Sequence, residues 1–323
     1  MKKSKILALL LALIMAISIF SLTACEDNGE YPNGGNGNGY GSTGLQPIPE
    51  GGNGQDISSQ GLEAWWQFES LVGGVIPDLS DGNRPLSVTG NPNFAQGVSG
   101  NAFRLDGQTA LTFPADRYLR TDNDLSIAFW INIAGFTPPY EGANVGFDMW
   151  QNTIIDVEGA LAAMFTPFLV TLSLIWDLDT PDIVSLRATA APQGGPLGTA
   201  GQDAILTDAT EDVNFNEHRN EWIHVAVVWQ NAVDFDNPGT MTIYLNGLTN
   251  EFRQSDMFHG DGGPKMLGNT DQRPEHASRT TIGAWIDDSG TVRRGGIYSL
   301  DDMRIYSRAI TSAEVLSLAQ LHS

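Results

Sequence analysis

The chain of 323 residues has little cysteine and little positive charge. Its single cysteine, Cys25, excludes an intrachain disulfide, so the folded part must be held by its apolar core, by a bound cation or by both. Lysine and arginine together number 17 against 38 aspartate and glutamate residues, and the formal net charge is −21. Because an acidic surface repels phosphate backbones, we expect no nucleic acid as a partner. The same charge gives no electrostatic hold on anionic lipids.

The sequence also lacks the motifs of common hydrolases. It contains no Gly-x-Ser-x-Gly and no His-Glu-x-x-His sequence, and its five histidines show no metal-ligand spacing. Retaining glycoside hydrolysis needs two carboxyl groups about 5–5.5 Å apart. The nearest arrangement is Glu211 and Glu217, which lie six positions apart in a polar stretch. We therefore predict that the protein is not an enzyme, and a divergent glycoside hydrolase is the alternative.

The cysteine closes an N-terminal export pattern. A lysine-rich tip precedes an apolar run over residues 6–22, and the sequence LTAC ends at Cys25. These features predict a secretory signal peptide over residues 1–24. The cysteine at the cut resembles the lipobox of bacterial lipoproteins, in which that thiol is acylated. We expect an exported protein that is lipid-anchored to a bacterial membrane and displayed at the cell surface. An uncleaved anchor is the alternative, although its length is at the lower limit for a bilayer.

A segment rich in glycine and asparagine follows the cysteine. It offers almost nothing that burial could use to offset the entropy of ordering, so we predict a flexible tether over residues 25–60. As a random coil this tether would reach about 30–35 Å. The remainder, residues 61–323, is long enough for one all-β domain, since such domains run to roughly 200–250 residues.

The remainder consists of short apolar or alternating runs between Gly, Pro, Asn and Asp. Runs such as 125–133, 222–230 and 241–245 are rich in β-branched and aromatic residues, as half-buried strands require. Many short strands without βαβ alternation predict an all-β fold, a two-sheet antiparallel jelly-roll β-sandwich.

Two local signals predict the C-terminal part of the fold. The sequence DDSG at 287–290 separates two strand-like runs and predicts a hairpin. The one expected helix covers 311–321, where Thr311 is the N-cap and Glu314 completes a capping box.

Six segments occur in a fixed order along the chain: GLEAWWQFES, GNAFRLDGQTALTFP, LSIAFWINI, EWIHVAVVWQ, MTIYLNGL and GGIYSLDDMRIYSRAITSAEV. Together they resemble the LamG-like jelly-roll family within the concanavalin A-like lectin/glucanase superfamily. The resemblance covers most of residues 61–321 and implies the sandwich fold. One departure is Asn246, where the family has an aspartate. Because this fold hosts many activities, the resemblance implies the fold more strongly than the function.

The resemblance also implies a structural calcium ion near the rim of the sandwich. The matching positions are Asp78 and Ser80 in the first turn and Asp301 in the last strand. Strand alternation puts Asp301 on the same face as Met303, where a buried carboxylate needs a partner. That partner is either Ca²⁺, Arg308 or backbone N–H groups of a neighbouring strand.

Three tryptophans lie at expected strand ends or in loops beside polar residues: Trp150, Trp176 and Trp285. We take them as carbohydrate-binding candidates, because aromatic faces suit the C–H side of sugar rings; packing at the rim is the alternative. The predicted function is a non-catalytic surface module that binds carbohydrate or a glycoprotein. An envelope protein–protein interaction module, using the long connections 135–151 and 191–221, is the second hypothesis.

Overall fold

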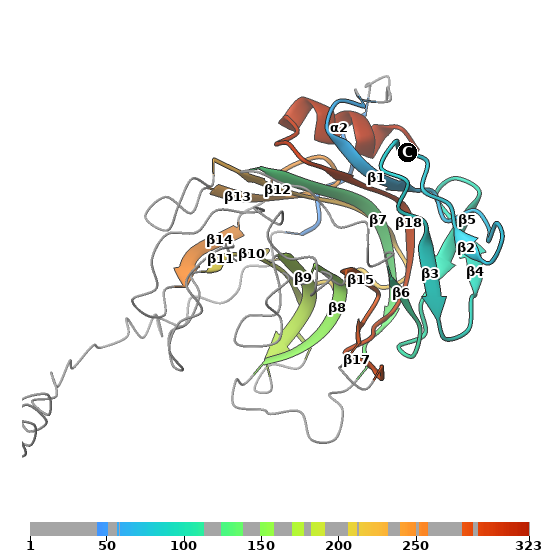
Figure 1. Cartoon of the computed structure of the whole chain (residues 1–323). Helices are drawn as coiled ribbons and strands as arrows, with labels where there is room; N and C mark the ends of the chain where they lie inside the picture. The colour runs from blue at the N-terminus through green and yellow to red at the C-terminus, as the bar shows by residue number, and fades with distance from the viewer. Residues whose placement is uncertain are drawn as a thin grey trace, which may run out of the picture. The chain divides into compact units, whose positions relative to one another are not determined.

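Two antiparallel β-sheets packed face to face make up the folded part of the chain, as the computed structural model shows (Figure 1). The residues described are 44–50, 57, 59–112, 124–137, 149–157, 170–177, 182–190, 206–211, 213–231, 240–249, 252–257, 280–286 and 290–322. Cys25 and the predicted signal peptide lie outside this set. Within it, no helix has the length and apolar character needed to cross a bilayer.

The first sheet has seven strands and is built around the apolar strands β7 and β12, which pair along most of their length. Its order is β13 (Thr240–Leu245), β12 (Trp222–Gln230), β7 (Leu125–Gly135), β18 (Ile297–Tyr306), β5 (Asn101–Arg104) and β4 (Phe94–Gln96), with β1 (Leu62–Trp66) also paired to β18.

The second sheet has nine strands, and a separate hairpin follows its strand β15. Its order is β14 (Phe252–Met257), β11 (Leu206–Glu211), β10 (Ser185–Ala190), β9 (Val170–Asp177), β8 (Met149–Val157), β15 (Thr280–Ile282), β6 (Ala110–Thr112), β3 (Leu86–Thr89) and β2 (Val75–Ile76). The hairpin pairs β16 (Trp285–Ile286) with β17 (Val292–Arg293), which confirms the hairpin predicted from DDSG.

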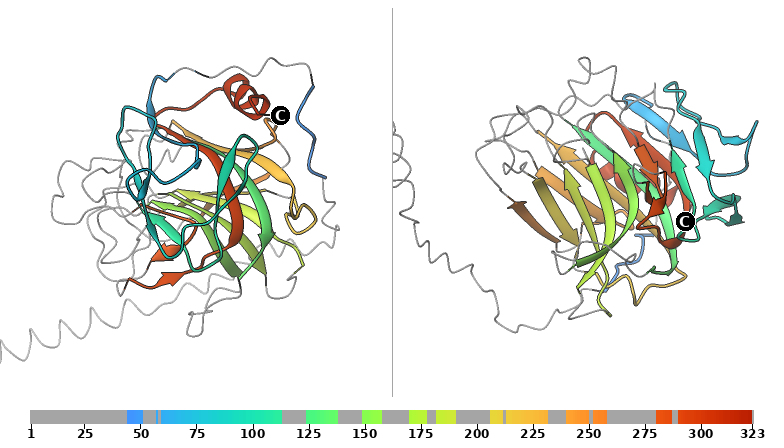
Figure 2. Two further views of the ribbon diagram at one scale, coloured as in Figure 1. Left: turned by 90° about the vertical axis from the view of Figure 1, so that its right-hand side faces the viewer. Right: turned by 60° about the horizontal axis from the view of Figure 1, so that its bottom comes forward.

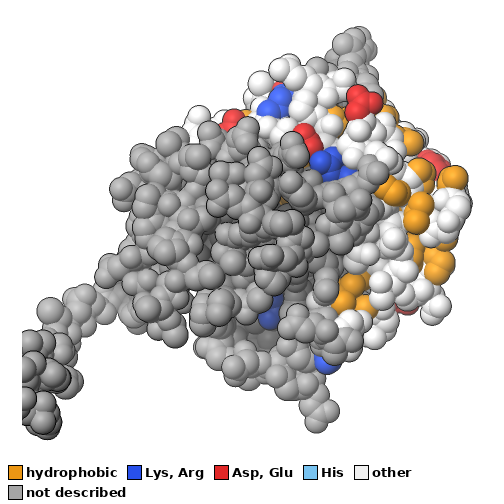
Figure 3. Space-filling model, viewed as in Figure 1, with side chains coloured by type: hydrophobic (Ala, Val, Ile, Leu, Met, Phe, Trp, Pro, Cys, Tyr) orange, Lys and Arg blue, Asp and Glu red, His pale blue; other side chains and the backbone are white. Residues whose placement is uncertain are grey.

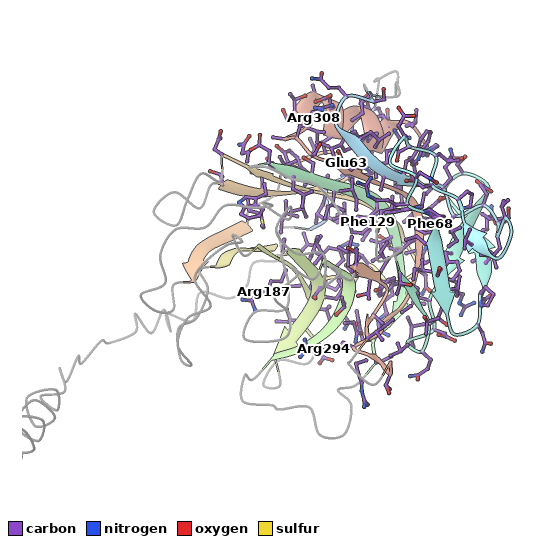
Figure 4. The ribbon with its side chains drawn as sticks, viewed as in Figure 1. Glu63, Phe68, Phe129, Arg187, Arg294 and Arg308 are labelled. Atoms are coloured by element: carbon purple, nitrogen blue, oxygen red, sulfur yellow. The ribbon has the colours of Figure 1, made fainter. Side chains whose placement is uncertain are left out.

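The apolar core fills the space between the two sheets, and Figure 2 shows the strands of both sheets from two further directions. Alternate residues of the central strands enter it, such as Phe129 of β7 and Leu174 of β9, both fully buried. Tyr298 of β18 crosses the core, and its hydroxyl donates a hydrogen bond to the carbonyl of Thr153 in β8. Figure 4 labels Phe129 and Phe68 in this interior. The two-sheet sandwich confirms the predicted fold class.

The predicted C-terminal helix forms as α2 (Ser312–Gln320). Thr311 is its N-cap, and the Thr311 hydroxyl and the Glu314 carboxylate make the reciprocal bonds of the predicted capping box. The apolar side of α2 packs on the outer face of the seven-stranded sheet, where Val315 and Leu318 meet Ala226 of β12.

Part of the predicted tether lies against the sandwich. Residues 44–50 are held by two hydrogen bonds: Asn246 Nδ2 donates to the carbonyl of Gln46 at 2.9 Å, and Gln320 Nε2 donates to that of Pro49 at 2.8 Å. The run LQPIPE is locally apolar and stiffened by proline, a feature that the average composition of the glycine-rich segment conceals.

One predicted connection also contains a strand. The segment 191–221, expected to be a long connection, includes β11, which pairs with β10 and β14. Its sequence LTDATE lacks the apolar alternation that identifies a strand, because small and polar residues occupy both of its faces.

Candidate functional site

The predicted calcium residues of the first turn are engaged with the backbone. Oδ1 of Asp78 accepts hydrogen bonds from the N–H groups of Trp65 and Ser80, both at 2.9 Å, and Oδ2 accepts one from Arg84 at 2.6 Å. The Ser80 hydroxyl donates to the carbonyl of Glu63 at 3.1 Å. Asp78 and Ser80 therefore fix the turn between β2 and β3.

Asp301 lies on the face of β18 that points away from the core, so its predicted alignment with Met303 is wrong. A bulge interrupts β18 between Asp301 and Arg304, and Asp302 within it has a φ of +42°. The extra residue reverses the alternation, so Asp301 pairs with the outward-facing Trp130 while Met303 enters the core. At this bulge the neighbour of β18 changes from β5 to β1.

The Asp301 carboxylate accepts three backbone hydrogen bonds. Oδ2 accepts from the N–H groups of Val98 and Ser99 at 2.9 and 3.3 Å, and Oδ1 accepts from that of Asp302 at 2.8 Å. Burial raises the pKa of Asp301 to about 6, although these three donors favour the ionised form. Asp301 thus caps the turn between β4 and β5, which is the hydrogen-bonded alternative to calcium.

Removing divalent cations is expected to leave the melting temperature of the protein unchanged. The carboxylates of Asp78 and Asp301 accept from different loops, and no cluster of three or more potential metal ligands occurs among the described residues. Thermal unfolding with EDTA and with added CaCl₂ checks this. A calcium-dependent rise in melting temperature that Asp301→Ala abolishes would support the calcium hypothesis and contradict this expectation.

The three candidate tryptophans belong to two parts of the fold. Trp150 of β8 and Trp176 of β9 are paired across neighbouring strands of the nine-stranded sheet. Trp285 belongs to the separate hairpin, opposite Arg293.

The outer side of the same sheet carries a row of polar residues that no sequence motif marks. On β9 and β10 the core residues Leu174 and Leu186 alternate with Ser173 and Arg187, which therefore face outward. Arg187 pairs with Ser173 on one side and with Thr210 on the other. Continued across the sheet, the first row consists of Thr153, Ser173, Arg187, Thr210 and Arg253.

A second polar row runs parallel to the first, two residues further along the strands. Each member bears a hydroxyl or a carboxylate group. The second row consists of Ser87, Thr112, Thr281, Asp156, Thr171, Thr189, Asp208 and Ser255.

Two hydroxyls in the middle of these rows are buried without a hydrogen-bond partner. Ser173 is 3% exposed and Thr281 is 1% exposed, and neither hydroxyl oxygen has a partner among the described residues. Ser87, at one end of the second row, is exposed, whereas Arg187 is half-buried. Because an unsatisfied buried polar group costs about 1–3 kcal/mol, these two hydroxyls leave unused hydrogen-bonding capacity in the middle of this face.

The hairpin forms a wall on this outer face. Ala110 of β6 packs with Ala284 and Ile286, and the carbonyl of Arg294 accepts a hydrogen bond from the N–H of Thr153 at 2.7 Å. Figure 4 shows Arg187 and Arg294 on the side of the nine-stranded sheet away from the other sheet. The candidate site therefore has the two polar rows as its floor and the hairpin, with Trp285, at its edge.

A buried cluster of charged groups lies on the outer face of the other sheet. Nε and Nη2 of Arg304 each donate to a carboxylate oxygen of Asp302 at 3.2 Å, and the indole N–H of Trp65 donates to the same carboxylate. Nε2 of His322 lies 3.1 Å from Asp302 Oδ2. Burial acts to raise the pKa of Asp302, but the hydrogen bonds and the charge of Arg304 hold it below its ordinary value.

The stabilising effect of His322 is expected to be lost at alkaline pH. Its hydrogen bond to Asp302 raises the pKa of His322 in the folded state above 6.5. The contribution of His322 to the free energy of unfolding is therefore fully present below about pH 6.5. It disappears as the pH rises through the pKa of His322 in the folded state. Urea unfolding of the wild type and of His322→Gln over a pH series should show a difference in the free energy of unfolding that becomes smaller above neutral pH. His218→Gln, in the exposed pair with Glu221, is the control, and a pH-independent difference for His322→Gln would contradict the assignment.

No family model matches the sequence, and no curated protein matches it. Three solved structures are similar in fold: the binding domain of Paraclostridial mosquitocidal protein 1 (14% identity, TM-score 0.48), the binding domain of botulinum neurotoxin serotype G (14%, 0.49) and domain 4 of AbnA, an extracellular arabinanase of Geobacillus stearothermophilus solved with arabinotriose (20%, 0.42). The alignments cover 80% of this chain and 52%, 50% and 98% of those chains, so it spans about half the length of the first two. These likenesses define neither a family nor a ligand for this chain, and membership of the LamG-like family stays a prediction.

Proposed function

We propose that the chain is a non-catalytic binding module for carbohydrate or glycosylated ligands and that the ligand lies on the outer face of the nine-stranded sheet. The observation that carries this proposal is the pair of polar rows, with the unpartnered hydroxyls of Ser173 and Thr281 at their centre. Hydroxyl, carboxylate and guanidinium groups together donate and accept hydrogen bonds, as sugar hydroxyls require. Trp285 in the wall supplies a residue type that covers the apolar side of a sugar ring.

The spacing of the acidic residues on the rows supports binding without hydrolysis. Asp156 and Asp208 belong to the second row and are separated by the two strands that carry Thr171 and Thr189. With strands about 4.8 Å apart, the two positions are about 14 Å from each other. The carboxyl pairs of glycoside hydrolases lie at most about 9.5 Å apart. This pair is therefore suited to holding a ligand, and we propose that the protein is not an enzyme.

The ligand proposal is tested by applying the mature chain, with Cys25→Ser to prevent acylation, to a glycan array and to immobilised polysaccharides. Binding of a defined set of glycans, competed by the free glycan, is the expected result. Absence of binding to every glycan would contradict the carbohydrate proposal.

A protein–protein interaction module is the second candidate, and a different surface favours it. Val72 and Leu79 are 61% and 47% exposed, which is high for large apolar side chains. Figure 3 shows hydrophobic side chains on the side of the molecule that carries β2 to β5. Cross-linking capture by the wild type but not by Val72→Asp/Leu79→Asp would favour this function, and equal capture by both would count against it.

We also propose that acylation of Cys25 presents the domain at the cell surface. The lipobox-like sequence supports this. Metabolic labelling with a fatty acid should mark the wild type and not Cys25→Ala, whereas labelling of both would contradict the proposal.

A further inference from the structure

We infer that residues 44–50, here called the strap, occupy a docking site for an extended proline-containing segment, and that this site also accepts the strap of a second copy of the chain. Copies of the protein then associate by exchanging their straps. The inference is independent of the proposed carbohydrate ligand. It concerns a different part of the fold, the turn that follows β13 and the end of α2.

The strap has the character of a polyproline II segment. Its sequence is GLQPIPE, it contains no helix or strand, and Pro47 and Pro49 favour the polyproline II conformation, which has three residues per turn. Burial follows this period: Leu45 and Ile48 are half-buried, whereas Gln46 and Pro47 are exposed. Leu45 packs against the core of the sandwich. One side of the strap therefore faces the domain.

The docking site supplies two side-chain amides to this segment. Asn246 donates to the carbonyl of Gln46, and Gln320 donates to the carbonyl of Pro49. These two carbonyls are three residues apart, which puts them on the same side of a polyproline II helix. Figure 2 shows the strap beside the end of α2. Binding of such a segment benefits from its preformed backbone, because little conformational entropy is lost.

Both donors are fixed by contacts that do not involve the strap. The backbone N–H of Asn246 donates to the carbonyl of His224 at 2.7 Å, and its Oδ1 accepts from the N–H of His224 at 3.1 Å, so Nδ2 is left for the strap. A Cβ atom on Gly247 would lie 2.8 Å from the side chain of Leu316. The turn after β13 therefore packs closely on α2, the helix that carries Gln320.

The strap gives a reason for the asparagine at 246, where the LamG-like resemblance implies an aspartate. A carboxylate could accept from the N–H of His224 as the amide does, but it has no hydrogen to donate to the carbonyl of Gln46. It would instead set a negative charge against a carbonyl oxygen. The amide of Asn246 is therefore suited to holding the strap.

A second copy of the chain supplies the same segment. The strap contributes no strand to either sheet, so its exchange leaves the pairing of both sheets in place. Its partners Asn246 and Gln320 lie 200 and 271 positions away from the residues they bind, so the site is not built from the neighbours of the strap in sequence. Exchange of an identical element is a low-cost route to dimers, because each chain regains the contacts that it gives up.

The test mixes two variants of the mature chain, both with Cys25→Ser, that are defective in complementary ways. The strap variant, Leu45→Ser/Ile48→Ser, keeps the docking site and loses the apolar contacts of the strap. The site variant, Asn246→Asp/Gln320→Glu, keeps the strap and loses both donors. Sedimentation velocity should show each variant alone as a monomer and their equimolar mixture as a dimer.

A control variant separates strap exchange from other association. Asn220→Asp/Gln108→Glu makes the same chemical changes at exposed positions, and Asn220 shares the positive φ of Asn246. Its mixture with the strap variant should dimerise about tenfold more weakly, because its own site already holds its strap at a high effective concentration. A mixture of the strap and site variants that stays monomeric, or dimerises no better than this control mixture, would overturn the inference.

A synthetic peptide gives a second measurement that does not depend on the site variant. The labelled peptide GLQPIPEG, with the sequence of residues 44–51, should bind the strap variant in a fluorescence anisotropy titration. It should bind the wild type at least about tenfold more weakly, since the wild-type site is filled. The same peptide with serine at both apolar positions is the control. Absence of peptide binding to the strap variant, verified as folded by circular dichroism, would also contradict the docking site.

Discussion

Replacing Asp302 by alanine is expected to lower the free energy of unfolding by about 3–5 kcal/mol, because a buried ion pair then loses one partner. Arg304 is 2% exposed and directs two donors at the Asp302 carboxylate, while its guanidinium also lies 4.4 Å from the centre of the Trp65 ring. Without the carboxylate, the buried Arg304 charge loses its ion pair with Asp302, and the Trp65 indole N–H loses the acceptor it has there. Urea unfolding monitored by tryptophan fluorescence measures the loss.

Two comparisons isolate the cause of that loss. Asp106→Ala removes an exposed carboxylate that accepts a hydrogen bond from the Gln108 N–H, and it should change stability little. The double variant Asp302→Leu/Arg304→Met removes both charges and should recover part of the stability that Asp302→Ala loses. Equal losses for Asp302→Ala and Asp106→Ala would contradict the buried-cluster interpretation.

Gly295→Ala is expected to lower the free energy of unfolding by about 1–3 kcal/mol and to weaken ligand binding, because it forces the hairpin away from the sheet. A Cβ atom at this position would lie 2.4 Å from the carbonyl oxygen of Gly107 and 2.8 Å from its carbon. Backbone atoms cannot rotate away as a side chain can. Gly295 directly follows Arg294, whose carbonyl ties the hairpin to Thr153, so the displacement moves the wall of the candidate site.

Gly135→Ala is the matched control for this substitution. Its Cβ would meet only the Ile297 side chain, at 3.7 Å, which is an ordinary contact. Stability should stay within about 0.5 kcal/mol of the wild type, and ligand affinity should not change. Urea unfolding and calorimetry on both variants provide the comparison. Similar losses for the two would show that the close approach of Gly295 to Gly107 is not the cause.

The elements that follow from local pattern could be predicted from the sequence. Strands β7 and β12 follow from their apolar and β-branched composition, and α2 follows from the capping box of Thr311 and Glu314. The bulge in β18 could not be predicted, because it depends on the exchange of β5 for β1 as a neighbour. That exchange depends on how the strands pair in the folded chain, and it decides which face of β18 Asp301 occupies.

The candidate site is invisible in the sequence for a related reason. A serine or threonine between apolar residues of a strand is typical of any solvent-facing position, so Ser173 and Thr281 carry no local signal. The polar residues become neighbours only through the register of the paired strands, from Thr153 in β8 to Arg253 in β14. Register also pairs Trp150 with Trp176: their places at strand ends could be predicted, but not their pairing.

Calorimetric titration of the array-selected polysaccharide into wild type, Ser173→Ala and Arg104→Ala tests the central claim most directly. The Ser173 hydroxyl is buried without a partner among the described residues, so its removal should cost no stability. The outer-face account predicts about tenfold weaker binding by Ser173→Ala at an unchanged melting temperature, and wild-type binding by Arg104→Ala. Undiminished binding by Ser173→Ala and by Arg187→Ala would contradict it and place the ligand elsewhere on the chain.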